Sequence, residues 1–312
     1  MKIQILMSTY NGEKYIGEQL DSIISQKGVD KTLLIRDDGS FDQTVEIIKD
    51  YQKRYPWISY YQGENIGVKY SFFDLIMKAD KCADFISFSD QDDVWYPDKL
   101  RHAVRCLKSF SAGEETPLLY CSSQTIVDEE LEPISVTVSR DVYAPSFGNA
   151  LVQNICTGCT AVINRSLLLL IRNNMPKHVD SIIMHDWWLY LSASCFGKVF
   201  FDRSSYLLYR QHSKNAFGAI TNRRRLLKYR LQQLIRPRGE IYSQAEEFYS
   251  SYYKPLKLQA AESNSNEKLL YCLLSARKAL RGRLKLIAEK QIFRQKVTDN
   301  CVYKLAVLIG KL

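Results

Sequence analysis

The chain has 312 residues, 46% of them apolar and 25% charged, which is typical of a folded protein and excludes a disordered one. No stretch reaches the roughly 18 apolar residues of a membrane-spanning helix, and the apolar N-terminal run is too short for a signal peptide, so we expect a cytoplasmic protein. Residues 223–312 carry 20 Lys and Arg against 7 Asp and Glu, a net charge of +13, whereas residues 1–222 carry 23 against 27, a net charge of −4.

Strands and helices alternate at the start of the chain. Short apolar runs predict strands, and apolar residues three or four positions apart predict amphipathic helices. We expect strands at 3–8, 31–36, 58–62 and 85–88, separated by helices at 17–26, 42–55 and 70–79. This order predicts an α/β fold with a doubly wound, mostly parallel sheet, in which ligands bind beyond the carboxyl ends of the strands.

Acidic residues follow two of these strands directly, at 37–40 (Asp-Asp-Gly-Ser) and at 90–93 (Asp-Gln-Asp-Asp). Three carboxylates in four residues repel one another unless solvent or a cation screens them, so the second cluster predicts a divalent metal site shared with substrate phosphates. The first cluster has two interpretations: it forms an ordinary turn, or it contacts a nucleoside. Because both follow strands of one parallel sheet, we expect them to face the same crevice.

Cys156 and Cys159 are the closest two of the eight cysteines. A structural zinc site needs a second pair or nearby histidines, and neither is present near them in the sequence. We therefore expect small buried thiols, which agrees with a reducing cytoplasm.

Asp186 stands between His185 and two tryptophans, Trp187 and Trp188, where a helix over 187–196 is predicted. Partial desolvation beside the indole rings can raise the pKa of a carboxyl, which suits a general base. The alternative is a helix N-cap, and the two roles are compatible.

Arg210 and His212 follow a predicted strand at 207–209. Neither a P-loop nor a dinucleotide fingerprint is present, so a metal ion and scattered basic groups must neutralise any bound phosphate. Arg210 is a candidate for pyrophosphate and His212 for the metal, although a lone histidine is more often structural.

The basic C-terminal region mixes apolar and basic residues at helical spacing over 223–235 and 276–287. Three interpretations stay open: a solvated face of a helical bundle, docking on an anionic membrane surface, and nucleic-acid binding. No nucleic-acid motif accompanies the charge, so we do not expect a nucleic-acid partner.

Together these motifs resemble glycosyltransferase family 2, which has the GT-A fold, over about residues 1–220. Residues 8–12 (Ser-Thr-Tyr-Asn-Gly) resemble its opening motif, 37–40 its nucleoside-binding motif, and 64–67 (Glu-Asn-Ile-Gly) its N-x-G segment. Residues 90–93 resemble its metal motif, and His185-Asp186 looks like the position of its catalytic motif, in which Glu or His precedes Asp. The chain lacks the Q-x-x-R-W motif of the processive members, which indicates that a single sugar is added.

Three further segments are similar to rhamnosyltransferase-like bacterial members: 90–95 (Asp-Gln-Asp-Asp-Val-Trp), 157–160 (Thr-Gly-Cys-Thr) and 209–212 (Tyr-Arg-Gln-His). This form favours dTDP-rhamnose as the donor, with a UDP-hexose as the alternative. The acceptor implied is a hydroxyl of a lipid-linked precursor of capsule, O-antigen or wall glycan, which places the enzyme at the inner face of the cell membrane.

The resemblance implies an inverting transfer with Asp186 as catalytic base and Mg²⁺ or Mn²⁺ held by Asp92 and His212. It implies a GT-A nucleotide-sugar-binding and catalytic domain over 1–222 and a basic helical region over 223–312. Trp95, Trp187 and Trp188 either shape sugar and acceptor subsites or pack in the core. The residues implied in nucleotide and donor binding are Thr9, Tyr10, Asn11, Asp37, Asp38, Asn65, Gly67, Asp90 and Arg210.

Two other classes compete with this interpretation. A sugar nucleotidyltransferase usually has a Gly-rich basic loop after its first strand, whereas residues 8–14 contain one glycine here. A non-catalytic module that binds nucleotide sugars or glycans would not need Asp186 together with three clustered carboxylates.

Overall fold

The computed structural model describes residues 1–109, 115–136, 144–212, 239–258 and 264–312. The chain divides into two compact units. Unit 1 comprises Met1–Arg140, Cys156–Arg172 and Phe196–Ala219, and unit 2 comprises Asp141–Ile155, Asn173–Cys195 and Ile220–Leu312. This division by packing differs from the predicted division by charge and role at residue 222, which stays a prediction.

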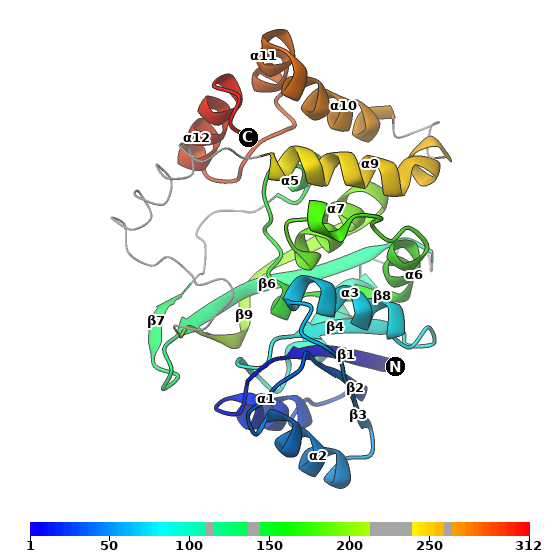
Figure 1. Ribbon diagram of the computed structural model, residues 1–312, viewed down its shortest axis with the longest axis vertical. Helices are drawn as coiled ribbons and strands as arrows, with labels where there is room; N and C mark the ends of the chain where they lie inside the picture. Colours follow the sequence, from blue (N-terminus) through cyan, green and yellow to red (C-terminus); the bar gives the residue numbers. More distant parts are fainter. Residues whose placement is uncertain (110–114, 137–143, 213–238, 259–263) are drawn as a thin grey trace. The chain divides into compact units, whose positions relative to one another are not determined.

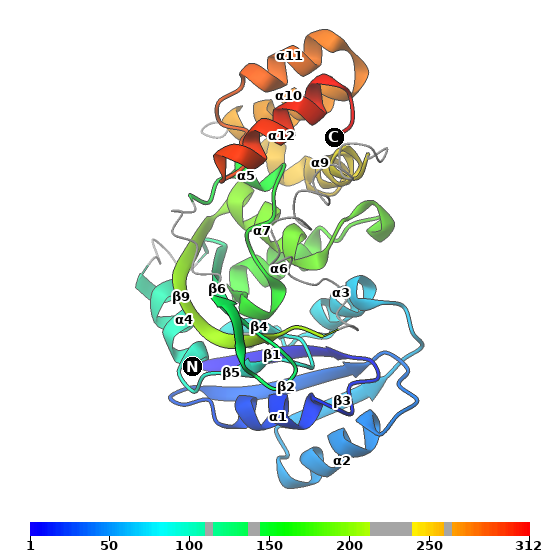
Figure 2. The same cartoon turned by 90° about the vertical axis from the view of Figure 1, so that its left-hand side faces the viewer.

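Unit 1 is built on one mixed sheet, whose described strands follow the order β3-β2-β1-β4-β8-β6-β9-β5, with β7 paired to β6 (Figure 1). The strands β1 to β4 are parallel to one another, whereas β8 runs antiparallel between β4 and β6. Strand β9 is parallel to β6 and antiparallel to β5, and it is long and curved (Figure 2). The strands are β1 Lys2–Thr9, β2 Asp30–Asp37, β3 Ile58–Gln62, β4 Phe85–Ser89, β5 Val94–Trp95, β6 Leu118–Val127, β7 Pro133–Val136, β8 Val162–Asn164 and β9 Lys198–Arg210.

Helices cover both faces of this sheet. Figure 2 shows α1 and α2 on one side of the parallel strands and α3 on the other. Side chains alternate along a strand, so Ile5 of β1 joins the core under α1 and α2, while its neighbour Leu6 is buried toward the other face. The helices are α1 Ile16–Ile24, α2 Thr44–Arg54, α3 Val68–Lys78, α4 Lys99–Ser109 and α6 Arg165–Asn173, with a short 3-10 turn η1 at Gly158–Thr160.

The predicted elements up to residue 89 are confirmed to within two residues at each end. The α/β class is also confirmed. The sheet is parallel where helices connect consecutive strands, and it becomes mixed beyond β4, where β8 and β7 run antiparallel to their partners. Cys156 and Cys159 are buried free thiols, as predicted.

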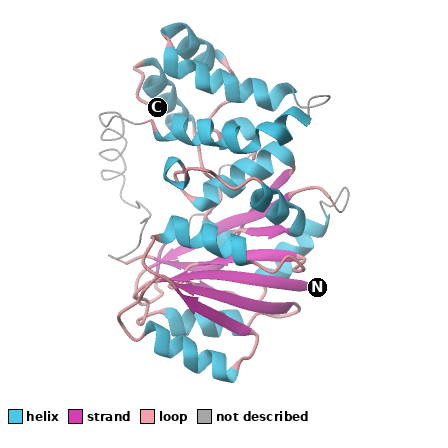
Figure 3. Ribbon diagram, turned by 45° about the vertical axis from the view of Figure 1, so that its right-hand side comes forward, coloured by secondary structure: helices cyan, strands magenta, loops and turns pink. Residues whose placement is uncertain are grey.

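The described elements of unit 2 are helical (Figure 3). Helix α7 begins at His185, so Asp186 lies in its first turn and the predicted N-cap role is wrong. The predicted helix over 223–235 lies outside the described residues. Among the described residues, no helix is both long and apolar enough to span a membrane. The elements are α5 Phe147–Ala150, η2 Val179–Ser181, α7 His185–Phe196, α9 Glu240–Leu258, α10 Asn264–Lys278, α11 Leu280–Ala288 and α12 Val297–Leu308.

Candidate active site

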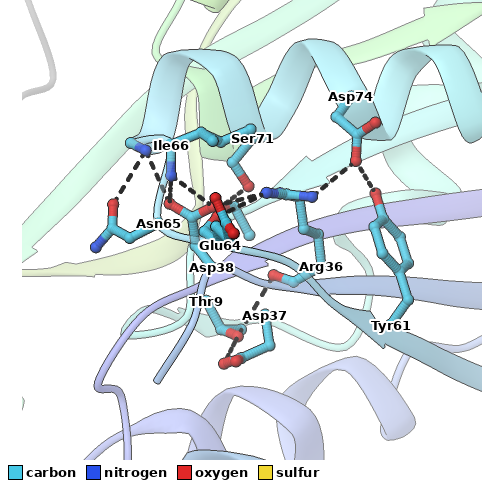
Figure 4. A network of polar contacts seen from close by, with 12 residues as sticks. Thr9, Arg36, Asp37, Asp38, Tyr61, Glu64, Asn65, Ile66, Ser71 and Asp74 are labelled. Atoms are coloured by element: carbon cyan, nitrogen blue, oxygen red, sulfur yellow. Dashed lines mark hydrogen bonds and ion pairs between the residues drawn. The ribbon is translucent and has the colours of Figure 1, made fainter. Parts of the chain in front are cut away.

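Thr9 and Asp37 are register partners at the carboxyl ends of β1 and β2. Asp37 is fully buried and accepts a hydrogen bond from the Thr9 hydroxyl at 3.1 Å (Figure 4). It also accepts the Ser40 backbone N–H at 3.0 Å and the Ser40 hydroxyl at 2.6 Å. Both predicted donor-binding side chains therefore stabilise the turn at 37–40, and a direct nucleoside contact by either stays a prediction.

Asp38 organises the loop that leads into α3 (Figure 4). Its buried carboxylate is paired with Arg36 at 3.0 Å and accepts the Gly67 N–H at 2.9 Å. Gly67 has a φ of 83°, a conformation that strains residues with a side chain. Asp38 thus holds the loop at 64–67, on which Asn65 is exposed.

Tyr10 and Asn11 lie on the loop that follows β1. Tyr10 is 42% exposed, and its ring packs edge-on against Phe41, which is 83% exposed, with centroids 6.3 Å apart. Asn11 adopts the left-handed conformation at φ 48°, and its side-chain oxygen accepts the Phe41 N–H at 3.0 Å. Two exposed aromatic rings beside a polar loop provide a surface on which a nucleobase can stack.

Gln91 joins this loop to the acidic loop at 90–93. Its side-chain oxygen accepts the Tyr10 N–H at 2.9 Å, and its amide donates to the Tyr10 carbonyl at 3.1 Å. A Cβ at Gly12 would lie 2.3 Å from the Gln91 oxygen, so a larger residue there would displace the Gln91 side chain from this contact. Loop 9–12 therefore contacts both acidic loops, since the Asn11 N–H also donates to the Ser40 hydroxyl.

Asp92 and His212, the two predicted metal ligands, are in contact. His212 Nε2 lies 2.9 Å from Asp92 Oδ2, and the two side chains are 8% and 13% exposed. The imidazole stacks on the Tyr15 ring with centroids 4.9 Å apart. Carboxylate oxygens suit Mg²⁺ and Mn²⁺, and an imidazole nitrogen is a common metal ligand, so the residues present fit a divalent cation. Asp90, half-buried in the same loop, adds a further carboxylate.

Arg210 has structural contacts on every side of its guanidinium, and its predicted pyrophosphate contact stays a prediction. The residue is 2% exposed, and its Nε donates to the Asp92 carbonyl at 2.9 Å. Its two terminal nitrogens donate to the Glu129 carbonyl and the Glu18 carboxylate, and the guanidinium lies 4.6 Å over the Tyr15 ring. Each guanidinium nitrogen is thus bonded to protein, and Arg210 holds the backbone of Asp92, one of the two predicted metal ligands.

Asp93 is the buried carboxylate of the acidic loop. It is 1% exposed, and its Oδ1 accepts the Arg210 backbone N–H at 3.3 Å. Burial, followed by the charges of Asp92 and Asp90, raises the pKa of Asp93 well above the usual carboxyl value. Because Asp93 is enclosed, Asp90 and Asp92 are the partly exposed carboxylates of this loop, and their contact with a ligand stays a prediction.

Trp95 and Trp188 pack in the core, which agrees with one of the two interpretations of these residues. Trp95 is 2% exposed, and the Lys99 ammonium lies 3.4 Å from its ring centroid. Trp188 is fully buried and packs against Phe248 and Tyr252 of α9, with centroids 5.4 and 5.7 Å away. Neither ring has a face open to a sugar.

Asp186 lies in unit 2 and is 9% exposed. Its neighbour His185 is buried, and burial lowers the pKa of His185 to about 3, so this imidazole is neutral at pH 7. Trp187 is half-buried, and its Nε1 donates to the Ala150 carbonyl at 2.6 Å, so its subsite role stays a prediction. The acidic loops belong to unit 1, and their meeting with Asp186 also stays a prediction.

Comparison with known proteins gives the family. Residues 4–113 match the model of "Glycosyl transferase family 2". The dTDP-rhamnosyl transferase RfbG of Shigella flexneri is 35% identical over 221 residues, which cover 68% of this chain and 74% of that protein. The chain belongs to glycosyltransferase family 2. The family 2 assignment makes it a nucleotide-sugar glycosyltransferase, as the sequence predicts, and sets aside the nucleotidyltransferase and the non-catalytic module.

Two further comparisons agree with family 2. An uncharacterized glycosyltransferase of Rickettsia typhi is 23% identical over 225 residues, covering 70% of this chain and 67% of that protein. A crystal structure of S. aureus TarS 1-349 in complex with UDP-GlcNAc has a TM-score of 0.55 at 15% identity, covering 99% of this chain and 91% of that chain. The structural likeness confirms the GT-A fold.

Several residues around this family 2 site were not predicted from the sequence. Gln91 stands inside the acidic motif at 90–93 and Phe41 directly follows the motif at 37–40, and these positions were the available indication. Glu18 and Glu129 gave no such indication, because they meet Arg210 across 192 and 81 residues of sequence.

Proposed function

We propose that this glycosyltransferase moves one sugar, with inversion at the anomeric carbon, from a nucleoside diphosphate donor to a hydroxyl of a lipid-linked cell-surface polysaccharide precursor. The contact between Asp92 and His212, beside the loops at 9–12 and 37–40, is the observation that carries the proposal. The relative named as a dTDP-rhamnosyl transferase favours dTDP-rhamnose as the donor, with a UDP-hexose as the alternative.

The exposed residues of the nucleoside loops bind the donor in this proposal. Tyr10 and Phe41 offer ring surface to the base, and Asn11 and Asn65 offer polar groups at the loop surface. Thr9, Asp37, Asp38 and Gly67 act by fixing these loops, since their polar groups bond to protein.

Asp92 and His212, with Asp90 nearby, hold the divalent cation in this proposal. A bound Mg²⁺ or Mn²⁺ supplies positive charge that stabilises the leaving diphosphate. Arg210 keeps the Asp92 backbone in place, and the Tyr15 ring supports the His212 imidazole from one face.

Asp186 acts as the base in this proposal. It takes the proton of the acceptor hydroxyl as that oxygen bonds to the anomeric carbon, and the bond from this carbon to the diphosphate oxygen breaks. A single displacement of this kind inverts the configuration. A positioned base contributes about 10²–10⁴-fold to the rate.

The donor and the metal requirement are tested together. The full chain is incubated with dTDP-rhamnose, UDP-glucose, UDP-galactose and UDP-GlcNAc, and the released nucleoside diphosphate is measured with and without a lipid-linked acceptor extract. We expect release with one donor, its loss in EDTA, and recovery when excess Mg²⁺ or Mn²⁺ is added. Full turnover in EDTA contradicts the metal proposal, and no turnover with any donor contradicts the donor proposal.

The base is tested with Asp186→Asn, which preserves shape and removes the proton-accepting charge. We expect the turnover to fall by about 10²–10⁴-fold with unchanged donor affinity in equilibrium binding. Asp180→Asn, an exposed carboxylate of unit 2, is the matched control and should keep full activity. Wild-type turnover of Asp186→Asn would remove Asp186 from the base role.

A further inference from the structure

Three potential metal ligands meet between α4 and β9 of unit 1. His102 Nε2 lies 2.7 Å from Asp202 Oδ2 and 3.4 Å from Cys106 Sγ. The three ligand atoms lie within 4.8 Å of one another. None of these residues belongs to the loops that bind donor or cation in the proposed function, so the cluster is considered independently of that function.

The backbone brings these side chains to one point. His102 and Cys106 are one turn apart on α4, and residues four apart lie on the same face of a helix. Asp202 stands on the neighbouring strand β9. A histidine and a cysteine at i and i+4, faced by a carboxylate from another element, form a three-ligand set.

Surrounding contacts orient two of the three ligands. The second oxygen of Asp202 accepts the Ser204 N–H at 2.8 Å, and Oδ2 also accepts the Tyr120 hydroxyl at 3.1 Å. The His102 ring stacks on Tyr206 with centroids 4.3 Å apart and an interplanar angle of 23°. Outer contacts of this kind fix ligand orientation around protein-bound metals and raise affinity.

The dimensions fit a four-coordinate ion. Zinc bonds of about 2.0–2.3 Å in a tetrahedron place ligand atoms roughly 3.3–3.8 Å apart. The 3.4 Å between nitrogen and sulfur is within that range, and the 2.7 Å between nitrogen and oxygen needs only a small opening. The side chains of His102 and Asp202 are 32% and 13% exposed, so an ion can enter and a water can fill the fourth position.

We propose that His102, Cys106 and Asp202 form a second metal site, for Zn²⁺ or a similar borderline-soft divalent ion. A thiolate and an imidazole favour such an ion over Mg²⁺, which prefers oxygen ligands. The bound ion cross-links α4 to β9, and β9 ends at Arg210, which holds the Asp92 loop. The site therefore stabilises the strand on which the active-site residues are mounted.

Cobalt spectroscopy tests this site, because Co²⁺ replaces Zn²⁺ and a thiolate ligand gives a charge-transfer band. The parent protein carries Cys82→Ser and Cys301→Ser, which remove the two exposed thiols, and is titrated with Co²⁺ in excess Mg²⁺. We expect a thiolate–cobalt band that saturates at one ion per chain and disappears when Zn²⁺ is added. Absence of this band in the parent would overturn the proposal without any ligand variant.

Three variants locate the ion. Cys106→Ser should lose the thiolate band, and Asp202→Asn should weaken Co²⁺ binding about tenfold or more, as loss of a ligand predicts. Cys159→Ser, which removes the buried cysteine beside the acidic loop, should keep the band. A band that persists in Cys106→Ser, or vanishes only in Cys159→Ser, assigns the ion elsewhere and overturns the proposal. Zn²⁺ should raise the melting temperature of the parent and leave that of Cys106→Ser unchanged.

Discussion

Arg210 joins three segments of unit 1 at the residue scale: the end of β9, the acidic loop through the Asp92 carbonyl, and α1 through Glu18. Two residues later, His212 bonds to the Asp92 side chain. Arg210 therefore determines how the two proposed metal ligands face each other. We expect this structural role in place of a phosphate contact, and the two roles predict different measurements.

The variant Arg210→Lys keeps the positive charge and loses the planar fork that bonds three partners at once. We expect the Mn²⁺ concentration for half-maximal activity to rise about 10–100-fold, because the supports of metal ligands typically carry an effect of this size. Binding of the nucleoside diphosphate without metal should not change. Activity against Mn²⁺ concentration and calorimetry in EDTA provide the two measurements.

Arg203→Lys is the matched control, since Arg203 is an exposed arginine of the same strand, and its metal dependence should equal that of the wild type. If Arg210→Lys instead weakens metal-free binding of the diphosphate and leaves binding of the nucleoside unchanged, Arg210 is a phosphate ligand and the structural role is wrong.

The site role of a single residue was predictable where its chemistry and its place after a strand suit few other roles. A carboxylate cluster after a strand and a histidine after another strand pointed to Asp92 and His212, which the fold brings together. Arg210, Trp95 and Trp188 were not predictable, because a buried arginine and a buried indole have the same sequence environment as exposed ones. The partners of Arg210 are Glu18 and Glu129 and those of Trp188 lie on α9, all remote in sequence.

Arg36 connects β2 to α3 at the scale of elements. Its guanidinium pairs with Asp38 at 3.0 Å and with Asp74 at 2.9 Å, and it donates to the Glu64 carbonyl at 3.0 Å (Figure 4). The side chains of Arg36 and Asp38 are 7% and 4% exposed. The buried Arg36 guanidinium thus neutralises Asp38 and binds the backbone of the loop on which Asn65 lies.

Arg36→Met should leave the Asp38 carboxylate buried without its cation. We expect the free energy of unfolding to fall by about 3–5 kcal/mol, because removing one partner of a buried ion pair strands the other charge. The Ile66 and Gly67 N–H groups, which donate to Asp38, should exchange with solvent faster. Urea unfolding and hydrogen exchange measure the two effects.

A second variant distinguishes the cost of the unpaired Asp38 charge from the loss of the packing of Arg36. Adding Asp38→Asn to Arg36→Met neutralises the buried carboxylate and should recover part of the lost stability. Lys53→Met, which removes an exposed ion pair with Asp50, is the control and should unfold as the wild type does. Equal stability of Arg36→Met and Lys53→Met would show that the Arg36 network does not stabilise the fold.

The elements of the parallel half were predictable, because each helix and strand there has a regular apolar pattern and the consecutive strands β1, β2 and β3 are neighbours in the sheet. The rest of the sheet was not predicted, apart from residues 207–209 of β9. Strand β8 has three residues and lies between β4 and β6, and β9 pairs with β6 across more than 70 residues of sequence. Such short or distant pairings leave no periodic pattern to detect.

At the scale of the whole molecule, charge and exposed apolar surface occur together in the C-terminal region. Leu280 and Leu284 of α11 are 58% and 53% exposed and lie one turn apart. Further exposed apolar residues occur on α12 and at its end, at Leu305, Leu308 and Ile309. Exposed basic residues stand beside the leucines, namely Arg277, Lys278, Arg281 and Lys285. This combination favours membrane docking among the three interpretations of the basic region.

We expect the full chain to float with vesicles that contain anionic lipid and not with neutral vesicles. Each basic residue near an anionic surface contributes about 1 kcal/mol, and salt screens this attraction, so binding should fall steeply as salt rises. The double variant Leu280→Glu/Leu284→Glu should lose at least tenfold in binding, because it removes inserted apolar surface and adds repelled charge. Met77→Glu, at a 43% exposed position of α3, is the control and should bind as the wild type does. If the wild type fails to float at low salt, or the double variant floats equally well, α11 does not dock on the membrane and the basic region is a solvated helical surface.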